Sequence, residues 1–527
     1  MLQLSKKCLI LRSFTKNDTK QKMSLVNILT SLYLRSNLNR TDLYLKYPDE
    51  TQFKTFSTIV KKAAKTDFGR QYGFDEILKV GPSEFAARVP LHPYELLKPY
   101  IMRVAQGEDN VLWPSKTKWF AMSSGTTDDR SKYIPITDDS LKKCHFAGGE
   151  DTLAVYLKNF PDTKAFTGKA LIIGGSRQVN RMGSETFCGD LSAVLISNLP
   201  RWVRGHRTPD LSIALMENWD KKIEAMAHAV CKENVTSMSG VPSWTLVLLR
   251  KILEITGKNN ILEVWPNLCL FMHGGVSFKP YRAQYEKLIP SDKMTYLETY
   301  NASEGFFAFQ NDQQSDDMLL MLDNGIYYEF IPMSDFNSET RNAIPLCEVK
   351  PGVNYAMVIS TNGGLWRYII GDTVEFTSVR PYKIRITGRT KHFINAFGEE
   401  LVEDNASRAI RAACNATGAD IRDYTAAPVY MQTDKRGCHQ WLIEFNVQPN
   451  DINAFASTLD FELRRLNSDY DANRYKDLSL TPPEITLARE NLFEDWLRSK
   501  GRVGGQNKIP RLENNRTIIE EMLEMNK

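Results

Sequence analysis

A short polar segment at residues 123–132 combines hydroxyl side chains, a glycine and a lysine. Four hydroxyls surround the glycine in the run Ser123, Ser124, Gly125, Thr126 and Thr127, and Lys132 follows. Hydroxyls and successive backbone N–H groups around a flexible glycine make a concavity that binds anions, and a lysine adds a charge for a β- or γ-phosphate. The segment lacks the G-x-x-x-x-G-K-[ST] spacing of a Walker loop. Phosphate binding is one interpretation, and a solvated turn is the other.

Three further segments have the composition of a nucleotide site, and each follows or interrupts an apolar, strand-like run. The first ends in the pair Gly274 and Gly275, where a flat ligand could approach the backbone. The second runs into small polar groups and the carboxylate of Glu304, and the third places Asp372 after a glycine. The structural alternatives are a turn, a surface acid and a hairpin turn, respectively.

The order of these motifs and the residues in them resemble those of the acyl-adenylate-forming enzymes, the superfamily of firefly luciferase. The series is Ser-Ser-Gly-Thr-Thr…Lys, Gly-Gly, Tyr-Asn-Ala-Ser-Glu, Tyr-Ile-Ile-Gly-Asp, Gly-Arg-Thr-Lys at 388–391 and Gln-Asn-Lys-Ile-Pro-Arg at 506–511. Within that superfamily the chain most resembles the auxin-responsive Gretchen Hagen family of acyl acid amido synthetases. The resemblance extends from Tyr44 to Arg511. No single motif is specific, whereas the ordered set is strong support.

The resemblance implies how the phosphates of ATP and their metal ion would be held. The phosphates would lie on the loop of Ser123, Ser124, Gly125, Thr126 and Thr127, with Lys132 as an auxiliary contact. Ser303 would contact the α-phosphate, and Glu304 would hold Mg²⁺ and so take part in catalysis. The chain departs from the plant pattern at Asp128 and Asp129, where small residues are usual. Two acids beside phosphate repel it unless they face solvent or the Mg²⁺ shell.

The resemblance also assigns the nucleoside and the catalytic lysine. Adenine would lie between two groups of residues, Tyr300, Asn301 and Ala302 on one side and Gly274 and Gly275 on the other. Asp372 would accept hydrogen bonds from both ribose hydroxyls, a task suited to a two-oxygen acceptor. Arg389 would reach the ribose or the phosphate. Lys508 would stabilise the adenylation transition state.

The implied chemistry has two half-reactions. A carboxylate attacks the α-phosphorus of Mg·ATP to give acyl-AMP and pyrophosphate. An amine, usually that of an amino acid in this family, then attacks the activated carbonyl after a rotation of the C-terminal domain. We expect the acid pocket near His145, Phe146 and residues 241–244. Two alternatives stay open: an acyl-CoA or other thioester-forming synthetase, and a catalytically silent nucleotide-binding protein of the same fold.

The composition argues against several classes of partner. The 527 residues are 42% hydrophobic and 25% charged, enough for two or more cores. A net charge of +4 without a dense Lys/Arg block argues against nucleic acid, and no run is long enough to span a membrane. Eight cysteines without C-x-x-C pairs predict reduced thiols in a cytoplasmic protein, and the seven histidines lack zinc-ligand spacing. The oligomeric state is left open, a monomer included.

The pattern of apolar runs predicts an α/β fold in two units, and the resemblance implies that the first is the adenylating domain, that the second is mobile and that a hinge joins them. Residues 24–390 are expected to form a large N-terminal adenylating domain of mixed sheets covered by helices, with a barrel-like part at 325–386. Residues 391–527 are expected to form a smaller, mobile C-terminal α+β domain. Residues 1–23 are basic, with an apolar core too short for a secretory signal, so we expect a disordered leader, with Met23 as an alternative start.

Three helix boundaries are also predicted. Asp138 or Asp139 is expected to cap a helix that passes through Tyr156, and Asp404 is expected to cap the first helix of the C-terminal domain. A later helix is expected over 452–469.

Overall fold

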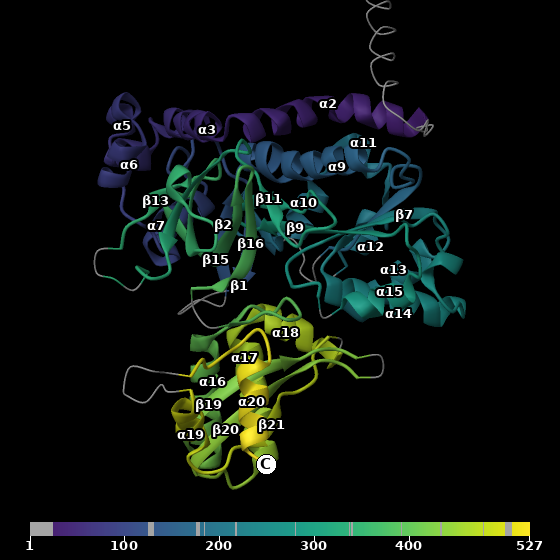
Figure 1. The fold of residues 1–527 in the computed structure, drawn as a ribbon, viewed down its shortest axis with the longest axis vertical. Helices are drawn as coiled ribbons and strands as arrows, with labels where there is room; N and C mark the ends of the chain where they lie inside the picture. Colours follow the sequence, from purple (N-terminus) through teal and green to yellow (C-terminus); the bar gives the residue numbers. More distant parts are fainter. Residues whose placement is uncertain are drawn as a thin grey trace, which may run out of the picture.

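The computed structural model describes residues 25–124, 131–174, 180–183, 185–216, 219–279, 281–336, 338, 341–390, 393–432, 435–477, 479–500 and 509–527. The expected leader, the loop residues Gly125, Thr126 and Thr127, and the expected catalytic Lys508 lie outside these ranges. A larger N-terminal lobe stands above a smaller C-terminal lobe that begins at Phe393 (Figure 1).

The N-terminal lobe begins with a run of helices. They are α2 (Leu25–Lys46), α3 (Pro48–Ala63), α4 (Asp67–Gln71), α5 (Phe74–Val80), α6 (Pro82–Arg88) and α7 (Tyr94–Ala105). Helix α3 shows why the sequence is helical here: Pro48 starts it, acids occupy its first turn and lysines its last, which complements the helix dipole. Helix α2 lies along the outer side of the lobe and packs against α9 (Ala147–Asn159) (Figure 1).

One large sheet organises the N-terminal lobe. Its strands run in the order β13 (Ile344–Pro345), β12 (Ile326–Pro332), β14 (Asn354–Thr361), β15 (Tyr368–Val379), β16 (Tyr382–Arg389), β11 (Met318–Leu320), β10 (Gly305–Phe309), β9 (Thr295–Ala302), β8 (Leu270–His273), β7 (Val235–Gly240), β3 (Lys169–Ile172) and β6 (Arg207–Thr208). Pairing is parallel from β6 to β9 and antiparallel from β9 to β13. Strand β9 is therefore where the sheet changes direction.

A smaller sheet and several helices complete this lobe. The sheet has the order β2 (Ser131–Ile136), β1 (Trp119–Ser124), β5 (Phe187–Gly189) and β4 (Asn180–Arg181). The remaining helices are α8 (Asp138–Ser140), the π-helix η1 (Leu141–Phe146), α10 (Leu191–Ser197), α11 (Arg201–Arg204), α12 (Leu211–Ala214), α13 (Trp219–Val230), α14 (Pro242–Thr256), α15 (Arg282–Leu288) and the 3₁₀ turns η2 (Ile261–Glu263) and η3 (Leu346–Glu348). The strands between these helices give the mixed α/β fold that the sequence predicts.

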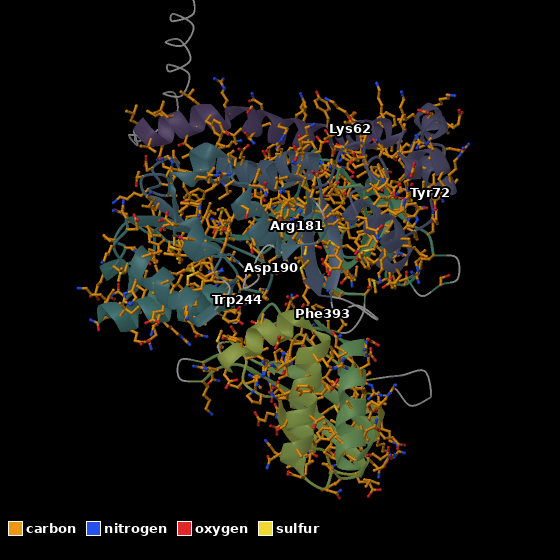
Figure 2. The ribbon with its side chains drawn as sticks, turned by 180° about the vertical axis from the view of Figure 1, so that it is seen from behind. Lys62, Tyr72, Arg181, Asp190, Trp244 and Phe393 are labelled. Atoms are coloured by element: carbon orange, nitrogen blue, oxygen red, sulfur yellow. The ribbon has the colours of Figure 1, made fainter. Side chains whose placement is uncertain are left out.

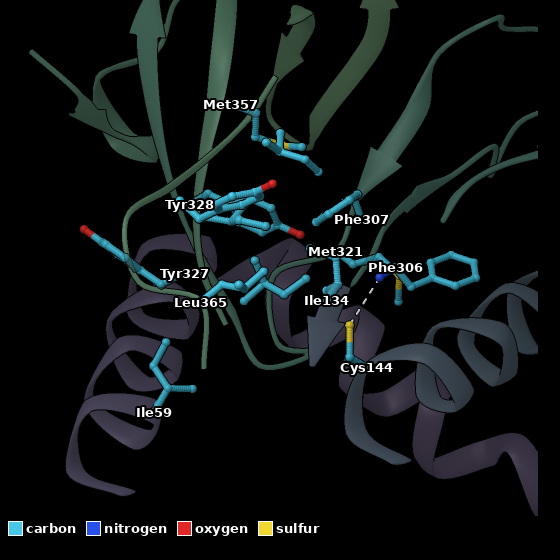
Figure 3. Close-up of a cluster of buried hydrophobic side chains, with 14 of the residues drawn as sticks. Ile59, Ile134, Cys144, Phe306, Phe307, Met321, Tyr327, Tyr328, Met357 and Leu365 are labelled. Carbon is cyan, nitrogen blue, oxygen red and sulfur yellow. Dashed lines mark hydrogen bonds between the residues drawn. The ribbon is translucent and has the colours of Figure 1, made fainter. Parts of the chain in front are cut away.

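Two large apolar cores lie among the described residues, and one of them spans both lobes. The first packs α3 against the antiparallel strands, with Ile59 and Tyr328 among its side chains (Figure 3). In the same region the Phe306 backbone N–H donates to Cys144 Sγ at 3.2 Å (Figure 3). The second core extends from the parallel half of the sheet into the C-terminal lobe, and contains both Phe271 and Trp441. The two lobes therefore share buried apolar surface.

The C-terminal lobe is an α+β unit. It contains the strand pair β17 (Phe393–Ile394) and β18 (Leu401–Val402), the sheet β19 (Asp420–Val429), β20 (Cys438–Val447) and β21 (Glu484–Leu487), and the helices α16 (Glu403–Thr417), α17 (Ile452–Leu466), α18 (Ser468–Arg474), α19 (Leu492–Ser499) and α20 (Thr517–Met525), with the 3₁₀ turn η4 (Tyr475–Asp477). Helix α16 ends as expected at Gly418, whose φ of 68° is easily adopted by glycine. Helix α18 lies on the side that faces the N-terminal lobe (Figure 1).

Five local expectations need correction or lack support. The helix expected to be capped by Asp138 or Asp139 is capped by Thr137, whose hydroxyl accepts from Ser140 N. Helix α16 begins one residue before Asp404, and the helix expected over 452–469 ends at Leu466, where α18 follows. The alternative of a hairpin turn at 371–372 is wrong, because both residues lie inside β15. The barrel-like part is not confirmed, since the described strands of 325–386 belong to the large sheet, with β13 at its edge.

Two further properties concern thiols and membranes. No disulfide joins the cysteines that the structure describes, and Cys144, Cys188 and Cys438 are buried. Within the described ranges, none of the helices combines the length and apolarity needed to cross a bilayer.

Candidate active site

A cavity of 1230 Å³ opens at the carboxyl ends of the parallel strands. The residues that end or follow β3, β7, β8 and β9 line it, including Gly174, Gly240, His273 and Asn301. Ligands of open α/β sheets bind outside the carboxyl ends of the parallel strands. The topology alone therefore marks this cavity as the candidate site.

The residues expected at the nucleotide converge on this cavity. Its lining contains the members of the predicted set whose side chains or backbone the structure places here: Lys132, Gly274, Gly275, Tyr300, Asn301, Ala302, Ser303, Glu304, Asp372 and Arg389. Ser123 and Ser124 form the end of β1, where Ser123 pairs with Lys132 of β2. The side chains of these two serines are outside the described part.

The end of β9 presents Glu304 to the cavity. The chain turns at Ser303 and Glu304 and returns as the antiparallel β10, so a strand end projects the carboxylate. Tyr368 Oη lies 3.5 Å from Glu304 Oε1 as a donor. Loss of hydration raises the pKa of Glu304 to about 7, the charge of Lys132 opposes the rise, and that of Asp372 adds to it. Glu304 is thus a desolvated carboxylate with the positive charge of Lys132 nearby.

Asp372 and Arg389 are cross-strand partners on β15 and β16. Arg389 Nε donates to Asp372 Oδ1 at 2.9 Å, and Tyr300 Oη donates to Asp372 Oδ2. Each carboxylate oxygen carries a second lone pair, so the group can still accept from two more hydroxyls. Arg389 also donates through Nη1 to Glu400 Oε2 at 3.3 Å. Burial lowers the pKa of Arg389 and the surrounding carboxylates raise it by more, so the guanidinium stays charged.

The glycine pair after β8 allows a close approach of backbone segments. A Cβ on Gly274 would lie 2.3 Å from the carbonyl oxygen of Thr299, which no side chain tolerates. Gly275 has a φ of 83°, in the left-handed region that favours glycine. The pair is therefore required by the fold, and it also leaves this wall of the cavity without side chains.

Lys132 supplies a second cation. It lies in β2, its Nζ is 5.7 Å from the centre of the Tyr94 ring, and its side chain lines the cavity. Burial lowers the pKa of Lys132, while the charge of Glu304 counteracts that effect. Because Lys132 and Arg389 both interact electrostatically with Glu304, this end of the cavity holds two cations around one desolvated carboxylate.

His145 lines the region expected to hold the acid. Its Nδ1 lies 3.0 Å from Asn301 Oδ1, so with the amide in this orientation Nδ1 carries the proton. Its Nε2 is buried and bonds no group among the described residues. Burial lowers the pKa of His145 to about 4, so the imidazole is neutral at pH 7. Phe146, Val241 and Trp244 line the same cavity.

The sequence did not single out two side chains that the structure adds to the site. Tyr368 approaches Glu304, and Glu400 pairs with Arg389. Tyr368 is part of the Tyr-Ile-Ile-Gly-Asp motif, so its position was a usable signal. Glu400 follows the segment 393–399, and only the folded chain shows that this acid returns to the cavity.

Comparison with known proteins identifies the fold and the family. The GH3 family N-terminal domain matches residues 37–294, the GH3 family central domain matches 319–389, and the GH3 family C-terminal domain matches 404–517. In solved structures, the chain resembles "AtGH3.15 acyl acid amido synthetase in complex with 2,4-DB" with a TM-score of 0.61 and 17% identity, covering 96% of this chain and 98% of that one. It also resembles 2-hydroxyisobutyryl-CoA ligase in the thioesterification state, with a TM-score of 0.57, 13% identity and coverage of 91% and 92%.

Named relatives agree with these matches. Indole-3-acetic acid-amido synthetase GH3.3 of Arabidopsis thaliana is 22% identical, over 88% of this chain and 89% of the relative. The 4-substituted benzoates-glutamate ligase GH3.12 of the same plant is 22% identical, over 86% and 91%. The expectation of an acid–amino acid ligase is confirmed, because these relatives are an amido synthetase and a glutamate ligase. Since the family domains together match most of its length, the chain belongs to the GH3 family.

Proposed function

We propose that this enzyme adenylates a carboxylic acid with ATP and then transfers the acyl group to the amine of an amino acid, giving an amide, AMP and pyrophosphate. The observation that carries the proposal is the convergence of Glu304, Asp372, Arg389 and Lys132 on one cavity at the carboxyl ends of the parallel strands. The acid–amino acid ligases among its relatives support the same reaction.

The side chains suit the first half-reaction. A substrate carboxylate oxygen bonds to the α-phosphorus while the bond to the pyrophosphate oxygen breaks. Lys132 and Arg389 supply positive charge near the phosphates, and Asp372 accepts from the ribose hydroxyls. Fixed charges of this kind need no reorganisation as charge moves to the leaving group.

A magnesium ion fits the oxygen donor present here. Glu304 is a partly buried, desolvated carboxylate, and among the described residues no three His, Cys, Asp or Glu side chains form a complete metal cage. Mg²⁺ is commonly held by one or two carboxylates together with substrate phosphates and waters, so one protein ligand suffices. Glu304 would hold the ion, which when bound neutralises phosphate charge as pyrophosphate leaves.

In the second half-reaction the amine nitrogen bonds to the acyl carbonyl carbon, the bond to AMP breaks, and the nitrogen gives up a proton. We propose that the chain divides after residue 390 and that the C-terminal lobe turns between the two steps. The lack of a disulfide among the described cysteines supports a reducing, cytoplasmic location.

The test is product analysis across a panel of carboxylic acids, with ATP and each amino acid in turn. Phosphorus NMR should show AMP and pyrophosphate with a responsive acid, and mass spectrometry should show an amide. ADP and phosphate as main products would contradict adenylation. A parallel set with coenzyme A and no amino acid tests the thioester alternative, which predicts faster turnover with the thiol than with any amine.

A further inference from the structure

Two carbonyl groups of the C-terminal lobe are held by side chains of the N-terminal lobe. Tyr281 Oη donates to the Ala396 carbonyl at 2.6 Å. The Phe397 carbonyl accepts from two donors, Ser243 Oγ at 3.2 Å and Trp244 Nε1 at 3.0 Å. We call Ser243, Trp244 and Tyr281 the carbonyl clamp. All the bonds of the clamp join α14 or the start of α15 to the segment 393–400.

The same two residues are held from their other side within the C-terminal lobe. The Glu399 carboxylate accepts from Phe397 N at 2.7 Å and from Ala396 N at 3.3 Å. His439 Nε2, on β20, lies 2.7 Å from Glu399 Oε1, and both side chains are fully buried. The carbonyls of Ala396 and Phe397 therefore bond to one lobe and their N–H groups to the other.

Burial makes these contacts specific to one arrangement of the lobes. Tyr281 and Phe397 are fully buried, and Ser243 is too. Separating the lobes exposes the two carbonyls and the Tyr281 phenol to water. A smaller movement of the lobes that admits no water would leave these buried polar groups without hydrogen bonds. The free-energy cost of such unpaired groups exceeds the net stabilisation that the hydrogen bonds provide. Trp244 and Phe393 mark the two facing sides of this junction (Figure 2).

The clamped segment reaches the nucleotide end of the cavity. Asn395 Nδ2 donates to the Gly275 carbonyl at 2.9 Å, and Glu400 pairs with Arg389. Glu400 has a φ of 42°, a strained value for a residue with a side chain. Its backbone is fixed on both sides, because its N–H donates to Asn395 Oδ1 at 3.4 Å and its carbonyl accepts from Asn467 Nδ2 at 3.2 Å. Asn467 also caps α18.

This arrangement brings a particular face of the C-terminal lobe to the cavity. Phe393, Asn395 and Glu400 line the cavity, as does Asp469 of α18. Ile509, by contrast, packs with α19 in a core of the C-terminal lobe and is not part of the cavity wall. Helix α19 lies on the far side of that lobe from the junction (Figure 1). Ile509 is thus held in that core, whereas Asn514, further along the same segment, lines the cavity and accepts from Asn395 N at 2.6 Å.

We propose that the carbonyl clamp is a positioning device for the acyl-transfer half-reaction, holding segment 393–400 and its Glu400 against the cavity after adenylation. The inference rests on the proposed two-step function. In the clamp proposal, Tyr281 touches neither substrate nor nucleotide and acts through Ala396. Loss of the clamp should weaken the arrangement used for amide formation and leave the adenylation arrangement unaffected.

The chain offers a matched pair of variants to test this. Tyr281→Phe removes the hydroxyl that bonds Ala396 across the junction, whereas Tyr285→Phe removes one that donates to Pro242 inside the N-terminal lobe, also at 2.6 Å. Both tyrosines are fully buried and lie one helical turn apart. Their loss should affect the stability of the N-terminal lobe similarly, so a difference between them reports the junction.

Each variant is assayed in two half-reactions and by hydrogen exchange. For Tyr281→Phe we expect acid-dependent ATP–pyrophosphate exchange within twofold of wild type and amide formation from supplied acyl-AMP slowed about fivefold, the effect of about one hydrogen bond. Faster exchange at the Ala396 and Phe397 amides should accompany it. Tyr285→Phe should change neither the relative rates of the two half-reactions nor the hydrogen exchange of the Ala396 and Phe397 amides.

Equal behaviour of the two variants, or equal slowing of both half-reactions by Tyr281→Phe, would overturn the clamp proposal. Absence of pyrophosphate exchange in the wild type with every acid would instead overturn the proposed function. In that case hydrogen exchange still decides whether Tyr281 holds the segment, since it needs no substrate, and unchanged protection at Ala396 and Phe397 would refute the clamp as well.

Discussion

The position of the Glu304 carboxylate lowers the stability of the folded protein. Burial raises its pKa to about 7, so the ionised form is disfavoured in the native protein. We expect Glu304→Gln to unfold at the same or a higher urea concentration than wild type.

We expect Glu304→Ala and Asp372→Ala to lose acyl-adenylate formation, with about 2 to 4 kcal/mol less transition-state stabilisation. Pyrophosphate exchange and urea unfolding are measured together.

A folded Asp372→Ala protein with normal turnover would show that the ribose is not held there. A Glu304→Gln protein that is both active and no more sensitive to Mg²⁺ concentration than wild type would remove Glu304 from the metal site. The unfolding curves guard against reading a folding defect as a catalytic one.

His145 gives a pH prediction for stability. Its folded-state pKa of about 4 is below the unfolded value near 6.5, so the unfolded chain binds the extra proton between these values. The stabilising contribution is complete above pH 6.5 and is lost as the pH falls toward 4. Relative to His145→Gln, the wild type should lose about 2 kcal/mol of unfolding free energy between pH 7.5 and pH 5. Glu304 contributes the opposite slope, but equally in both proteins.

Urea titrations of wild type and His145→Gln at the two pH values provide the check. A constant difference between the proteins would mean that the imidazole is protonated in the fold or is solvated. The comparison concerns stability alone and does not depend on which acid the enzyme uses.

At the residue scale, composition and order predicted which side chains meet at the site, but not how they pair. Glu304, Asp372 and Arg389 line one cavity as the resemblance implies. That Asp372 bonds Tyr300 and Arg389 depends on the register of β15 against β16, which local sequence does not specify. That Glu400 joins Arg389 depends on the placement of one lobe against the other.

At the element scale, a buried ion pair fixes the antiparallel half of the large sheet. Arg367, just before β15, donates to both oxygens of Glu329 on β12 at 2.9 to 3.2 Å. Its Nη1 also donates to the carbonyls of Ala86, inside α6, and Val89, directly after it. Both side chains are buried, and Arg367 has a φ of 42°. One residue thus joins two strands and the helical entry.

Breaking this pair should be costly because it leaves a buried charge uncompensated. We expect Glu329→Gln to lower the free energy of unfolding by about 3 to 5 kcal/mol, as judged by urea titration. The exposed pair Lys79 and Glu76 is a control, and Glu76→Gln should cost far less than Glu329→Gln, because solvent screens an exposed ion pair. Similar losses in the two variants would mean that the Arg367 site is reached by water.

Element boundaries show where sequence patterns suffice and where they do not. Strands such as β8 and β20 follow from apolar runs and alternation, because the burial pattern is local. The helix start at Thr137 was misassigned because threonine and aspartate are both good caps, and only the hydrogen bond to Ser140 decides between them. The single continuous sheet was not predicted, since the pairing of β11 with β16 joins strands about sixty residues apart.

At the scale of the whole molecule, the relation between the lobes determines which half-reaction the site can run. We expect Lys508→Ala to slow acid-dependent pyrophosphate exchange by about 100-fold or more, the usual size of one charged transition-state contact. Amide formation from supplied acyl-AMP should change by less than about fivefold, because a lysine near the end of the sequence of a mobile C-terminal domain reaches the α-phosphate in only one lobe orientation. Lys500→Ala is the matched control, since this lysine of the same lobe pairs with Glu521 on the surface. Equal losses in both assays would show that the lobes do not alternate, and would leave the arrangement held by Tyr281 as the one in which both steps occur.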